Sequence, residues 1–357
     1  MPNSSRFSLT LALLLGALTL SACGGGGDDA VAADTGMTNA TAASDLADGS
    51  GMLRAIVAAR KAAASDPLCD PAKLGDFYWE IGDGLNARPL VSHSEGAGSV
   101  TADSRFGIAS ATKFVFGAYV LQKKGIEQVR NDPVLQDGLR FMSGYTNLEQ
   151  RPCFGQTTVG GCFYSGDNSR FNPDALHRFY YNGGHDQKLA TVDLGMGDFT
   201  ARQVDRELQA TLGLSDRMRM APLAPLMAGG LQASAGDYAE FLRKLMTRQL
   251  VLGAHLGENA VCALPSACPD QALYSPLTQL NEPWSYSYNH WVESEHGNGT
   301  VDAYSSPGAF GFYPWIAPDR KYYGIVSRHD WTPNAGLASA QCGRQIRKAF
   351  LGALRQG

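Results

Sequence analysis

The sequence lacks the features of several large protein classes. It has no basic run, only 18% of its residues are charged, and its formal net charge is −4. Nucleic-acid binding depends on clustered lysine and arginine, so we expect no nucleic-acid partner. The sequence contains no HExxH or GxSxG motif and no CxxC or Cys/His spacing typical of zinc. We therefore expect neither a metal ion nor another cofactor.

The chain also lacks an apolar run long enough for a comfortable membrane span. The apolar stretch 8–20 is short, follows Arg6, and is followed by Leu20-Ser21-Ala22-Cys23. A basic start, an apolar core and small residues before a cut site describe a secretory signal. The tetrapeptide resembles the bacterial lipobox, in which the cysteine becomes the lipid-modified first residue. We expect an exported, periplasmic protein that is anchored to the membrane through Cys23; the alternative is a plain signal peptide.

What remains is the composition of a globular protein. The chain has 357 residues, of which 44% are hydrophobic and 41 are glycine, enough for one large domain or two. Residues 24–50 are small and polar without periodicity, so we expect a flexible tether there. Gly24 follows the lipobox cysteine, and by resemblance to Gram-negative lipoproteins this favours the outer membrane. The folded domain should then extend over residues 51–357.

The cysteines besides Cys23 predict disulfides, as is usual in exported proteins. Two pairs are close in sequence, Cys153 with Cys162 and Cys262 with Cys268, and each would close a loop. The pair that remains would join the two ends of the domain, Cys69 and Cys342. The N- and C-terminal segments should therefore lie side by side.

The order of the predicted elements is helix, strands, helices, strands, helix. Helices are expected from alanine content and amphipathic spacing at 51–64, 106–125, 198–214, 234–250 and 334–356. Strands are expected from aromatic and β-branched runs at 75–84, 88–96, 284–294, 301–318 and 320–330. This order predicts an α+β fold, with one antiparallel sheet built from both chain ends, flanking helices and an inserted helical region.

A serine and a lysine at the start of the helix predicted within 106–125 are candidates for nucleophilic chemistry. Ser110 and Lys113 form the only S-x-x-K of the chain, and positions i and i+3 share one helix face. A serine needs a neighbouring base or positive field, which a buried lysine can supply. The alternative is that Ser110 caps the helix and Lys113 is solvated. The apolar neighbours of Lys113 speak against that alternative.

The stretch FGIASATKFVFGAYVL resembles the nucleophile segment of the serine β-lactamase/penicillin-binding-protein superfamily, in particular its class C β-lactamase and family VIII esterase branch. The passage AGGLQASAGDYAEF is similar to another segment of that family, with Gly229, Gly230 and Asp237 in the matching places. The resemblance covers residues 51–357 and implies a β-lactamase/transpeptidase-like fold.

The family carries a second element, Y-x-N, for which three segments compete. RFYYNGGHDQKLA is similar to the family passage F-x-Y-S-N-x-x-Y-x-L-L, so we choose Tyr180 and Asn182. The other candidates are Tyr145-Thr-Asn147 and Ser287-Tyr-Asn289. The resemblance implies that Tyr180 is a general base toward Ser110, and that Asn182 binds a substrate carbonyl or Lys113.

The third element departs from the family pattern of Lys-Thr-Gly or His-x-Gly. The best match is Ser306-Pro307-Gly308, which has no cation at its first position. The site therefore lacks the group that would receive the carboxylate of a β-lactam or a peptide. The backbone N–H of Ala309 is expected to act beside that of Ser110 as an oxyanion donor.

These residues predict a serine hydrolase that forms an acyl-enzyme on a small ester, amide or peptide substrate. Because the third element has no cation, uncharged esters or amides are favoured. The alternatives are a β-lactamase or D-alanyl-D-alanine peptidase, and a non-catalytic binding protein of the same fold. The histidines His185 and His329 and most tryptophans are expected in the core or at the surface rather than in a site.

Overall fold

The computed structural model describes residues 36–222 and 224–355, with no side chains for residues 36–48. The predicted signal peptide (1–23) with Cys23 and the first part of the predicted tether lie outside these residues. Helix α1 (Gly36–Ser65) includes residues 36–50, which we expected in the flexible tether. The helix predicted at 51–64 supplies a nucleus, and each further residue extends it without a new nucleation step. Residues 47–357 form one compact unit, which is described below.

The centre of this unit is an eight-stranded antiparallel sheet. Its strands lie in the order β2 (Val91–Glu95), β1 (Phe77–Asp83), β13 (Tyr322–Ser327), β12 (Tyr313–Ile316), β11 (Ala303–Ser305), β10 (His290–Glu293), β9 (Ser285–Ser287) and β7 (Val261–Cys262). Strand β1 from the first part of the chain pairs with β13 near its end, with Tyr78 opposite Ser327. The prediction of one sheet from both chain ends is confirmed.

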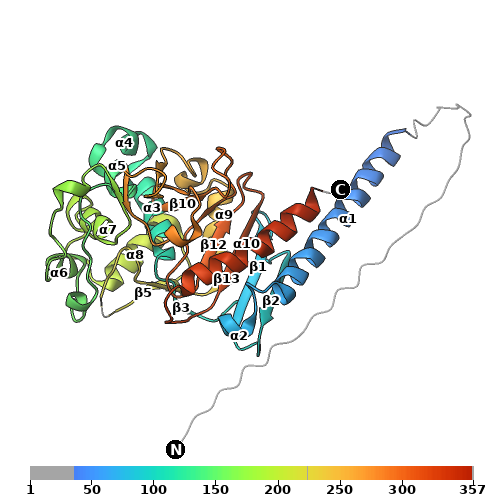
Figure 1. The fold of residues 1–357 in the computed structure, drawn as a ribbon, viewed down its shortest axis with the longest axis horizontal. Coiled ribbons are helices and arrows are strands. Elements are labelled where there is room, and N and C mark those ends of the chain that lie inside the picture. Colours follow the sequence, from blue (N-terminus) through green and yellow to red (C-terminus); the bar gives the residue numbers. More distant parts are fainter. Residues whose placement is uncertain (1–35, 223, 356–357) are drawn as a thin grey trace, which may run out of the picture. The chain divides into compact units, whose positions relative to one another are not determined.

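Helices cover both faces of this sheet, and the sequence alternation of β1 shows why. Phe77 and Trp79 pack with the helices α1 and α10 (Ala335–Leu354) on one face. Tyr78, between them, belongs to the core formed with α3 (Ala111–Lys124) and α9 (Ala235–Met246) on the other face. Successive residues of a strand point to opposite faces, so a strand buried on both sides is apolar on both. Figure 1 shows α10 lying along strands β12 and β13.

The remaining helices belong mainly to the inserted region and lie on the far side of the unit from β1 and β2 (Figure 1). They are α4 (Ile126–Asn131), α5 (Pro133–Leu139), α6 (Val159–Phe163), α7 (Gly184–Lys188), which continues as a π-helical turn (Leu189–Asp193), and α8 (Ala201–Leu212); α2 (Pro71–Leu74) precedes β1. Two small sheets complete the fold, β3 (Phe106–Gly107) with β6 (Leu231–Ala233) and β5 (Arg219–Met220), and β4 (Phe179–Tyr180) with β8 (Ala272–Tyr274).

Local sequence signals set the ends of the helices that matter for the site. The Ser234 hydroxyl accepts from the backbone N–H of Asp237, and the Asp237 carboxylate accepts from that of Ser234, so a capping box starts α9. Helix α3 ends at Lys123, Lys124 and Gly125, whose φ of 76° is in the left-handed region. The helix starts at Ala111, later than predicted, because Phe106 and Gly107 pair with β6 instead.

The structure confirms the predicted pairing of the cysteines. Disulfides join Cys69 to Cys342, Cys153 to Cys162 and Cys262 to Cys268. The first of these holds the segment before α2 to α10, with 4.8 Å between the two Cα atoms, which brings the chain ends together.

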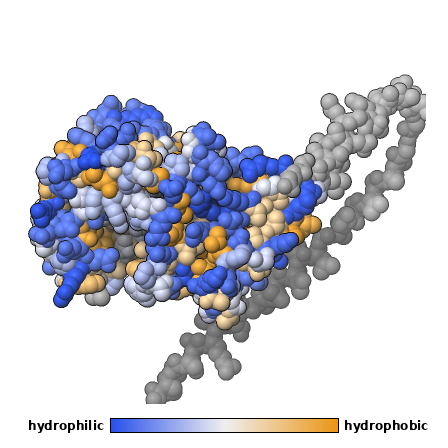
Figure 2. Space-filling view, in the orientation of Figure 1, coloured by the Kyte–Doolittle hydropathy of each residue, from blue (hydrophilic) through white to orange (hydrophobic). Residues whose placement is uncertain are grey.

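The surface is mixed in character. On the face drawn in Figure 2, hydrophilic residues predominate and apolar residues gather in separate small patches. Within residues 36–222 and 224–355, no helix has the length and apolar character needed to span a membrane. The same residues contain no group of histidine, cysteine and carboxylate side chains arranged to hold a metal ion.

Candidate active site

Ser110 is the residue immediately before helix α3, and it lines a cavity of about 180 Å³. Its hydroxyl does not cap the helix. The residue before it, Ala109, has a φ of 44°, in the left-handed region that residues with a side chain rarely adopt. Such local strain concentrates at sites whose geometry matters for function. The alternative interpretation of Ser110 as an ordinary helix cap is therefore not what the structure shows.

Lys113 is buried beneath Ser110, with 4% of its surface exposed. Its Nζ donates to Ser110 Oγ at 3.1 Å and to the carbonyl oxygen of Ala228 at 2.6 Å. The rings of Tyr181 and Phe141 lie 5.1 Å and 6.0 Å from Nζ. Burial lowers the pKa of Lys113, because the ammonium loses its hydration. The alternative of a solvated Lys113 is excluded by this geometry.

The carbonyl of Ala228 belongs to the AGGL passage, for which the sequence indicated only an architectural part. The passage also holds Lys113, since the Ala228 oxygen is its nearest partner. Gly230 allows the tight turn, because a Cβ there would come within 2.8 Å of the Leu226 carbonyl oxygen. Contacts between backbone carbonyls and distant side chains leave no signal in a single sequence.

The tyrosine beside Ser110 is Tyr181 and not the predicted Tyr180. Tyr181 lines the cavity together with Ser110 and Trp291. Burial raises the pKa of Tyr181, so the hydroxyl is neutral in the free protein. Tyr180 lies in β4, where its ring packs on Tyr274 and its carbonyl oxygen bonds His185.

The register of the family passage accounts for this difference of one residue. Matching on Y-x-N selects Tyr180 and Asn182, whereas matching on the preceding phenylalanine, Phe179, selects Tyr181. Asn182 does not line the cavity; its Oδ1 accepts from the backbone N–H of Gly184 at 2.8 Å and forms a turn. The asparagine position of the passage is then Gly183, where a Cβ would come within 2.9 Å of Ala228. A larger residue there would press on the loop that holds Lys113.

The other two candidates for the Y-x-N element, Tyr145-Thr-Asn147 and Ser287-Tyr-Asn289, do not line the cavity. The side-chain amide of Asn147 donates to the Asp167 carbonyl oxygen at 3.1 Å. The Ser287 hydroxyl donates to the Glu258 carbonyl oxygen at 2.5 Å. Asn289, the end of the third candidate, is buried near the site but does not line the cavity.

The third element packs directly against the nucleophile. The hydroxyl of Ser306 donates to the Ser110 carbonyl oxygen at 2.9 Å, so it holds the backbone and is buried. Gly308 lines the cavity, and a Cβ there would collide with the carbonyl oxygen of Ile108. Glycine is therefore required for the strand end to come this close to the segment before Ser110.

Two backbone N–H groups at this junction are free to bind an oxyanion. Those of Ser110 and Ala309 have no hydrogen-bond partner within residues 36–222 and 224–355. Both residues line the cavity. Paired backbone donors beside a nucleophile are the usual means of stabilising a tetrahedral oxyanion.

The cavity wall contains no charged side chain among the described residues. Its lining consists of neutral polar and apolar residues: Ser110, Tyr181, Pro276, Leu277, Trp291, Pro307, Gly308, Ala309, Asn334, Gly336 and Leu337. The absence of a cation from the third element is thus not compensated by another lysine, arginine or histidine in this wall. Trp291 is the tryptophan that lines the site; Trp284 and Trp315 are core residues, and Trp331 is exposed.

One buried ionisable residue near Lys113, Asp186, was not singled out from the sequence. Asp186, on α7, is fully buried, and its Oδ1 accepts from the side-chain amide of Asn289 at 2.8 Å. Burial raises the pKa of Asp186, against the opposing effects of Lys113 and Asn289. Nothing in the local sequence marks this aspartate as buried, because α7 is too short to show a periodicity.

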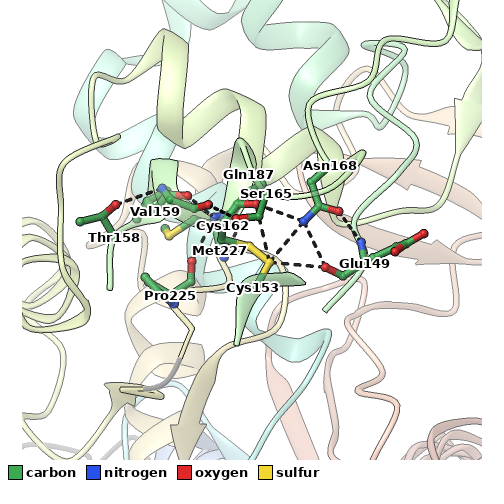
Figure 3. Close-up of a disulfide and its surroundings, with 11 residues drawn as sticks. Glu149, Cys153, Thr158, Val159, Cys162, Ser165, Asn168, Gln187, Pro225 and Met227 are labelled. Atoms are coloured by element: carbon green, nitrogen blue, oxygen red, sulfur yellow. Dashed lines mark hydrogen bonds between the residues drawn. A yellow bond between two sulfur atoms is a disulfide. The ribbon is translucent and has the colours of Figure 1, made fainter. Parts of the chain in front are cut away.

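The residue after Asp186 connects the site to a disulfide loop. The amide of Gln187 donates to the carbonyl oxygens of Val159 and Pro225 and accepts from the backbone N–H of Met227. Figure 3 shows these groups beside the Cys153–Cys162 disulfide, with the Asn168 amide directed at Cys153. The disulfide loop therefore supports the segment 225–228 that holds Lys113.

Neither His185 nor His329 lines the cavity, as expected from the sequence. His185 is fully buried, its Nδ1 lies 2.7 Å from the Ser143 hydroxyl, and burial lowers its pKa to about 3. The imidazole is therefore neutral: Nε2–H donates to the Tyr180 carbonyl and Nδ1 accepts from Ser143. His329 stacks on Phe106 near the surface.

No protein-family model and no curated protein sequence matches the chain. Solved structures do match. A penicillin-binding protein from Bacillus halodurans has 14% identity and a TM-score of 0.54, over 75% of this chain and 95% of that chain. The D-amino acid amidase from Ochrobactrum anthropi SV3 has 12% identity and a TM-score of 0.53, over 79% and 96%.

A third structure is that of EstCE1, a hydrolase with promiscuous acyltransferase activity. It has 14% identity and a TM-score of 0.56, over 85% of this chain and 99% of that chain. At such identities the likeness concerns the fold, and it agrees with the antiparallel sheet, the flanking helices and the inserted helical region. The chain therefore has the β-lactamase/transpeptidase-like fold of these structures.

Proposed function

We propose that this protein is a serine hydrolase that cleaves uncharged esters or amides through an acyl-enzyme. The observation that carries the proposal is the contact of 3.1 Å between Ser110 Oγ and the buried Nζ of Lys113, at the wall of a cavity without charged side chains. The structural neighbours include a hydrolase and an amidase by their printed names, which agrees with this class of reaction.

In the acylation step Ser110 Oγ attacks the carbonyl carbon of the substrate. Lys113 takes the hydroxyl proton, which is possible because its lowered pKa leaves part of it neutral near physiological pH. The C–O bond to the serine forms, and the carbonyl oxygen becomes an oxyanion that the N–H groups of Ser110 and Ala309 receive.

Collapse of the tetrahedral intermediate expels the leaving group, which needs a proton. Tyr181 is neutral and lines the cavity with Ser110, so it can donate its proton to the leaving atom and recover one from the Lys113 ammonium. A water molecule then attacks the acyl carbon, Lys113 accepts its proton, and Ser110 Oγ regains a proton as the acid leaves. In this proposal Tyr181, and not the predicted Tyr180, is the tyrosine that transfers a proton beside Ser110.

The choice of uncharged substrates follows from the cavity wall. A β-lactam or a D-alanyl-D-alanine peptide presents a carboxylate, and burying that charge without a cation is costly. The third element has Ser306, which is occupied with the Ser110 carbonyl, where the family has a lysine or histidine. A non-catalytic binding protein would have no need of a lysine whose ammonium is desolvated beside a serine hydroxyl.

Mass spectrometry of the intact protein tests the proposal. The wild type is incubated with a panel of short-chain nitrophenyl esters and amides and with a chromogenic cephalosporin, and Ser110→Ala is treated in the same way. We expect ester hydrolysis with a transient acyl adduct in the wild type, and neither in Ser110→Ala, with the rate falling by several orders of magnitude. Faster turnover of the cephalosporin than of every ester would contradict the substrate class, and equal turnover by Ser110→Ala would contradict the nucleophile.

A further inference from the structure

Asp186 is the buried charge that the reaction as described above does not use. It is fully buried, and its two neighbours in α7, His185 and Gln187, are fully buried as well. Ionisable side chains are seldom buried completely unless they are paired. A carboxylate in this position therefore needs an explanation.

The fold places Asp186 near Lys113 by way of Asn289. Helix α3 carries Lys113, and one turn later Gly117 lies against the turn between β9 and β10. A Cβ at Gly117 would come within 2.8 Å of the Asn289 side chain, so glycine is needed for this approach. Asn289, with φ of 62°, then directs its amide to Asp186 Oδ1 at 2.8 Å.

The hydrogen bonds of this group are incomplete. Asp186 Oδ2 and Asn289 Oδ1 are buried without a hydrogen-bond partner in the described part of the chain. Lys113 has three ammonium protons, and its hydrogen bonds to Ser110 and Ala228 use two. The ammonium and the carboxylate do not form a direct ion pair among the described contacts, but they affect each other through a dry, low-dielectric interior.

The two charges influence each other in opposite directions. Burial lowers the pKa of Lys113, and the negative charge of Asp186 opposes that fall. Burial raises the pKa of Asp186, and the positive charge of Lys113 opposes that rise. Without the carboxylate, only the desolvation of the lysine would remain, and its pKa would fall further.

We propose that Asp186 is a positioning residue of this site, whose buried carboxylate offsets the burial of the Lys113 ammonium and so sets the pH range in which Lys113 accepts the proton of Ser110. The inference rests on the proposed function, because it assumes that Lys113 is the base. A base works best when its proton affinity matches the working pH, which burial alone would not achieve.

The other titratable groups that face this pair come from several elements. Tyr181 lies above Lys113, and burial and the charge of Asp186 raise the pKa values of Tyr181 and Tyr286. His185 precedes Asp186, and its burial and the charge of Lys113 keep it neutral. All three are uncharged at neutral pH, so Asp186 is the only group among them that can supply the opposing charge.

The test compares the pH dependence of Ser110 labelling by a fluorophosphonate in the wild type and in Asp186→Asn. In this reaction Oγ forms a bond to phosphorus, fluoride leaves and Lys113 takes the proton, so no substrate needs to be known. We expect the ascending limb of the labelling rate to move to lower pH by about 1 unit or more in Asp186→Asn, because the ammonium has lost its opposing charge. Asp186→Glu, if it folds, should restore the limb toward that of the wild type.

Asp137→Asn is the matched control. Asp137 is also a buried aspartate, but its charged neighbours are Arg140 and His177, with which it forms ion pairs. The same chemical change there should leave the limb unmoved, whatever it does to stability. An equal shift in both variants would overturn the inference, since it would then report a general structural effect.

The remaining outcomes separate this inference from the proposed function. If the wild type is not labelled at Ser110 at any pH, the proposed function and the inference both fail. If both proteins are labelled with the same limb, only the role of Asp186 is overturned. If circular dichroism shows that Asp186→Asn is unfolded, the labelling rate is measured for Asn289→Gly instead. This variant removes the amide that favours the charged carboxylate of Asp186. Its limb should move in the same direction by a smaller amount, and an unmoved limb would overturn the role of Asp186.

Discussion

Two fully buried carboxylates of this protein, Asp186 and Glu293, have pKa values that are shifted in opposite directions. Burial raises the pKa of Asp186, and neither Lys113 nor Asn289 reverses the effect. Burial would also raise the pKa of Glu293, but the charges of Arg347 and Arg344 outweigh it, so that the pKa of Glu293 is lowered. The difference arises from the partners of each group, since both are removed from water.

Glu293 lies at the end of β10, beneath helix α10, and both of its oxygens have partners. Its Oε1 accepts from the Tyr313 hydroxyl at 2.7 Å, and its Oε2 accepts from the guanidinium of Arg347 at 2.6 Å. Arg347 also donates to the Tyr313 oxygen at 2.8 Å. Asp186 has one amide as its partner and one oxygen without any.

Buried charges in the scaffold and buried charges at the site therefore differ in how many hydrogen-bond partners they have. In the scaffold, close hydrogen-bonded partners hold a buried carboxylate in its charged form and join the sheet to α10. At the site, the charges are buried with fewer partners, and their pKa values move toward neutrality from both sides. Groups that must exchange protons benefit from the second arrangement, and groups that must stay fixed benefit from the first.

The largest expected effect is on the free energy of unfolding, and it differs between the two buried cations, Arg347 beside Glu293 and Lys113 near Asp186. Arg347→Met leaves Glu293 buried with its main charged partner removed, so we expect the free energy of unfolding to fall by about 3–5 kcal/mol. Lys113→Met removes a desolvated cation and leaves Asp186, which becomes protonated with little cost, so we expect a loss of about 1 kcal/mol or less. Urea unfolding at neutral pH measures both. Equal losses would remove the distinction between the regions.

The next effect separates Tyr181, at the site, from Tyr313, beside Glu293: the first should affect the rate and the second the stability. Tyr181→Phe should lower the rate of ester hydrolysis by about 100-fold or more, because the proton donor is lost, with little change in stability. Tyr313→Phe should lower the free energy of unfolding by about 1–3 kcal/mol, because a buried carboxylate loses a donor, with the rate of the folded enzyme unchanged. The measurements are initial rates and urea unfolding for each variant.

Tyr180→Phe is the control for the first of these variants, because Tyr180 does not line the cavity. Its rate should stay close to that of the wild type. A large loss with Tyr180→Phe and none with Tyr181→Phe would favour the tyrosine that the sequence suggested.

The smallest effect is the opposite pH dependence that the two carboxylates give to stability. The pKa of Glu293 is lowered, so its contribution is present above its ordinary value of 4.5 and is lost as the pH falls through the folded value. The pKa of Asp186 is raised, so the folded state holds its proton more tightly and stability falls as the pH rises above 3.8. Relative to Glu293→Gln, the wild type should lose on the order of 1 kcal/mol on acidification.

Relative to Asp186→Asn, the wild type should lose a similar amount, on the order of 1 kcal/mol, as the pH rises toward neutrality. Urea unfolding of the three proteins from about pH 3 to pH 7 measures both trends. The same sign of pH dependence for both variants would contradict the comparison.

Local patterns predicted much of the fold. The aromatic run at 75–84 indicated a strand, and the lysines and glycine at the end of α3 indicated where that helix stops. The cysteine spacing indicated all three disulfides, and the pair Cys69–Cys342 then required the chain ends to meet. These predictions succeeded because each depends on neighbours in sequence or on a small number of possible pairings. The helical state of residues 36–50 was missed, because their polar composition hid the extension of a helix that starts to pack only later.

The site was predicted less completely, for a physical reason. Ser110 and Lys113 are one helical turn apart, so their contact follows from the sequence spacing alone. Tyr180 ends the two-residue strand β4 and Tyr181 follows it directly, and consecutive residues of an extended chain point to opposite sides. A shift of one residue in matching the passage therefore exchanges a side chain in the cavity for one outside it.

The sequence by itself thus indicated the α+β fold and the proximity of a serine and a lysine, and it suggested a pairing of the cysteines that the structure then established. Only the tertiary structure decided that Tyr181 faces Ser110, that the cavity wall is uncharged, and that Asp186 and Asn289 lie behind Lys113. These facts depend on contacts between residues far apart in the chain, such as Lys113 with Ala228 and Asp186 with Asn289. Burial of a charge and the choice of its partners are properties of such contacts, and no local pattern encodes them.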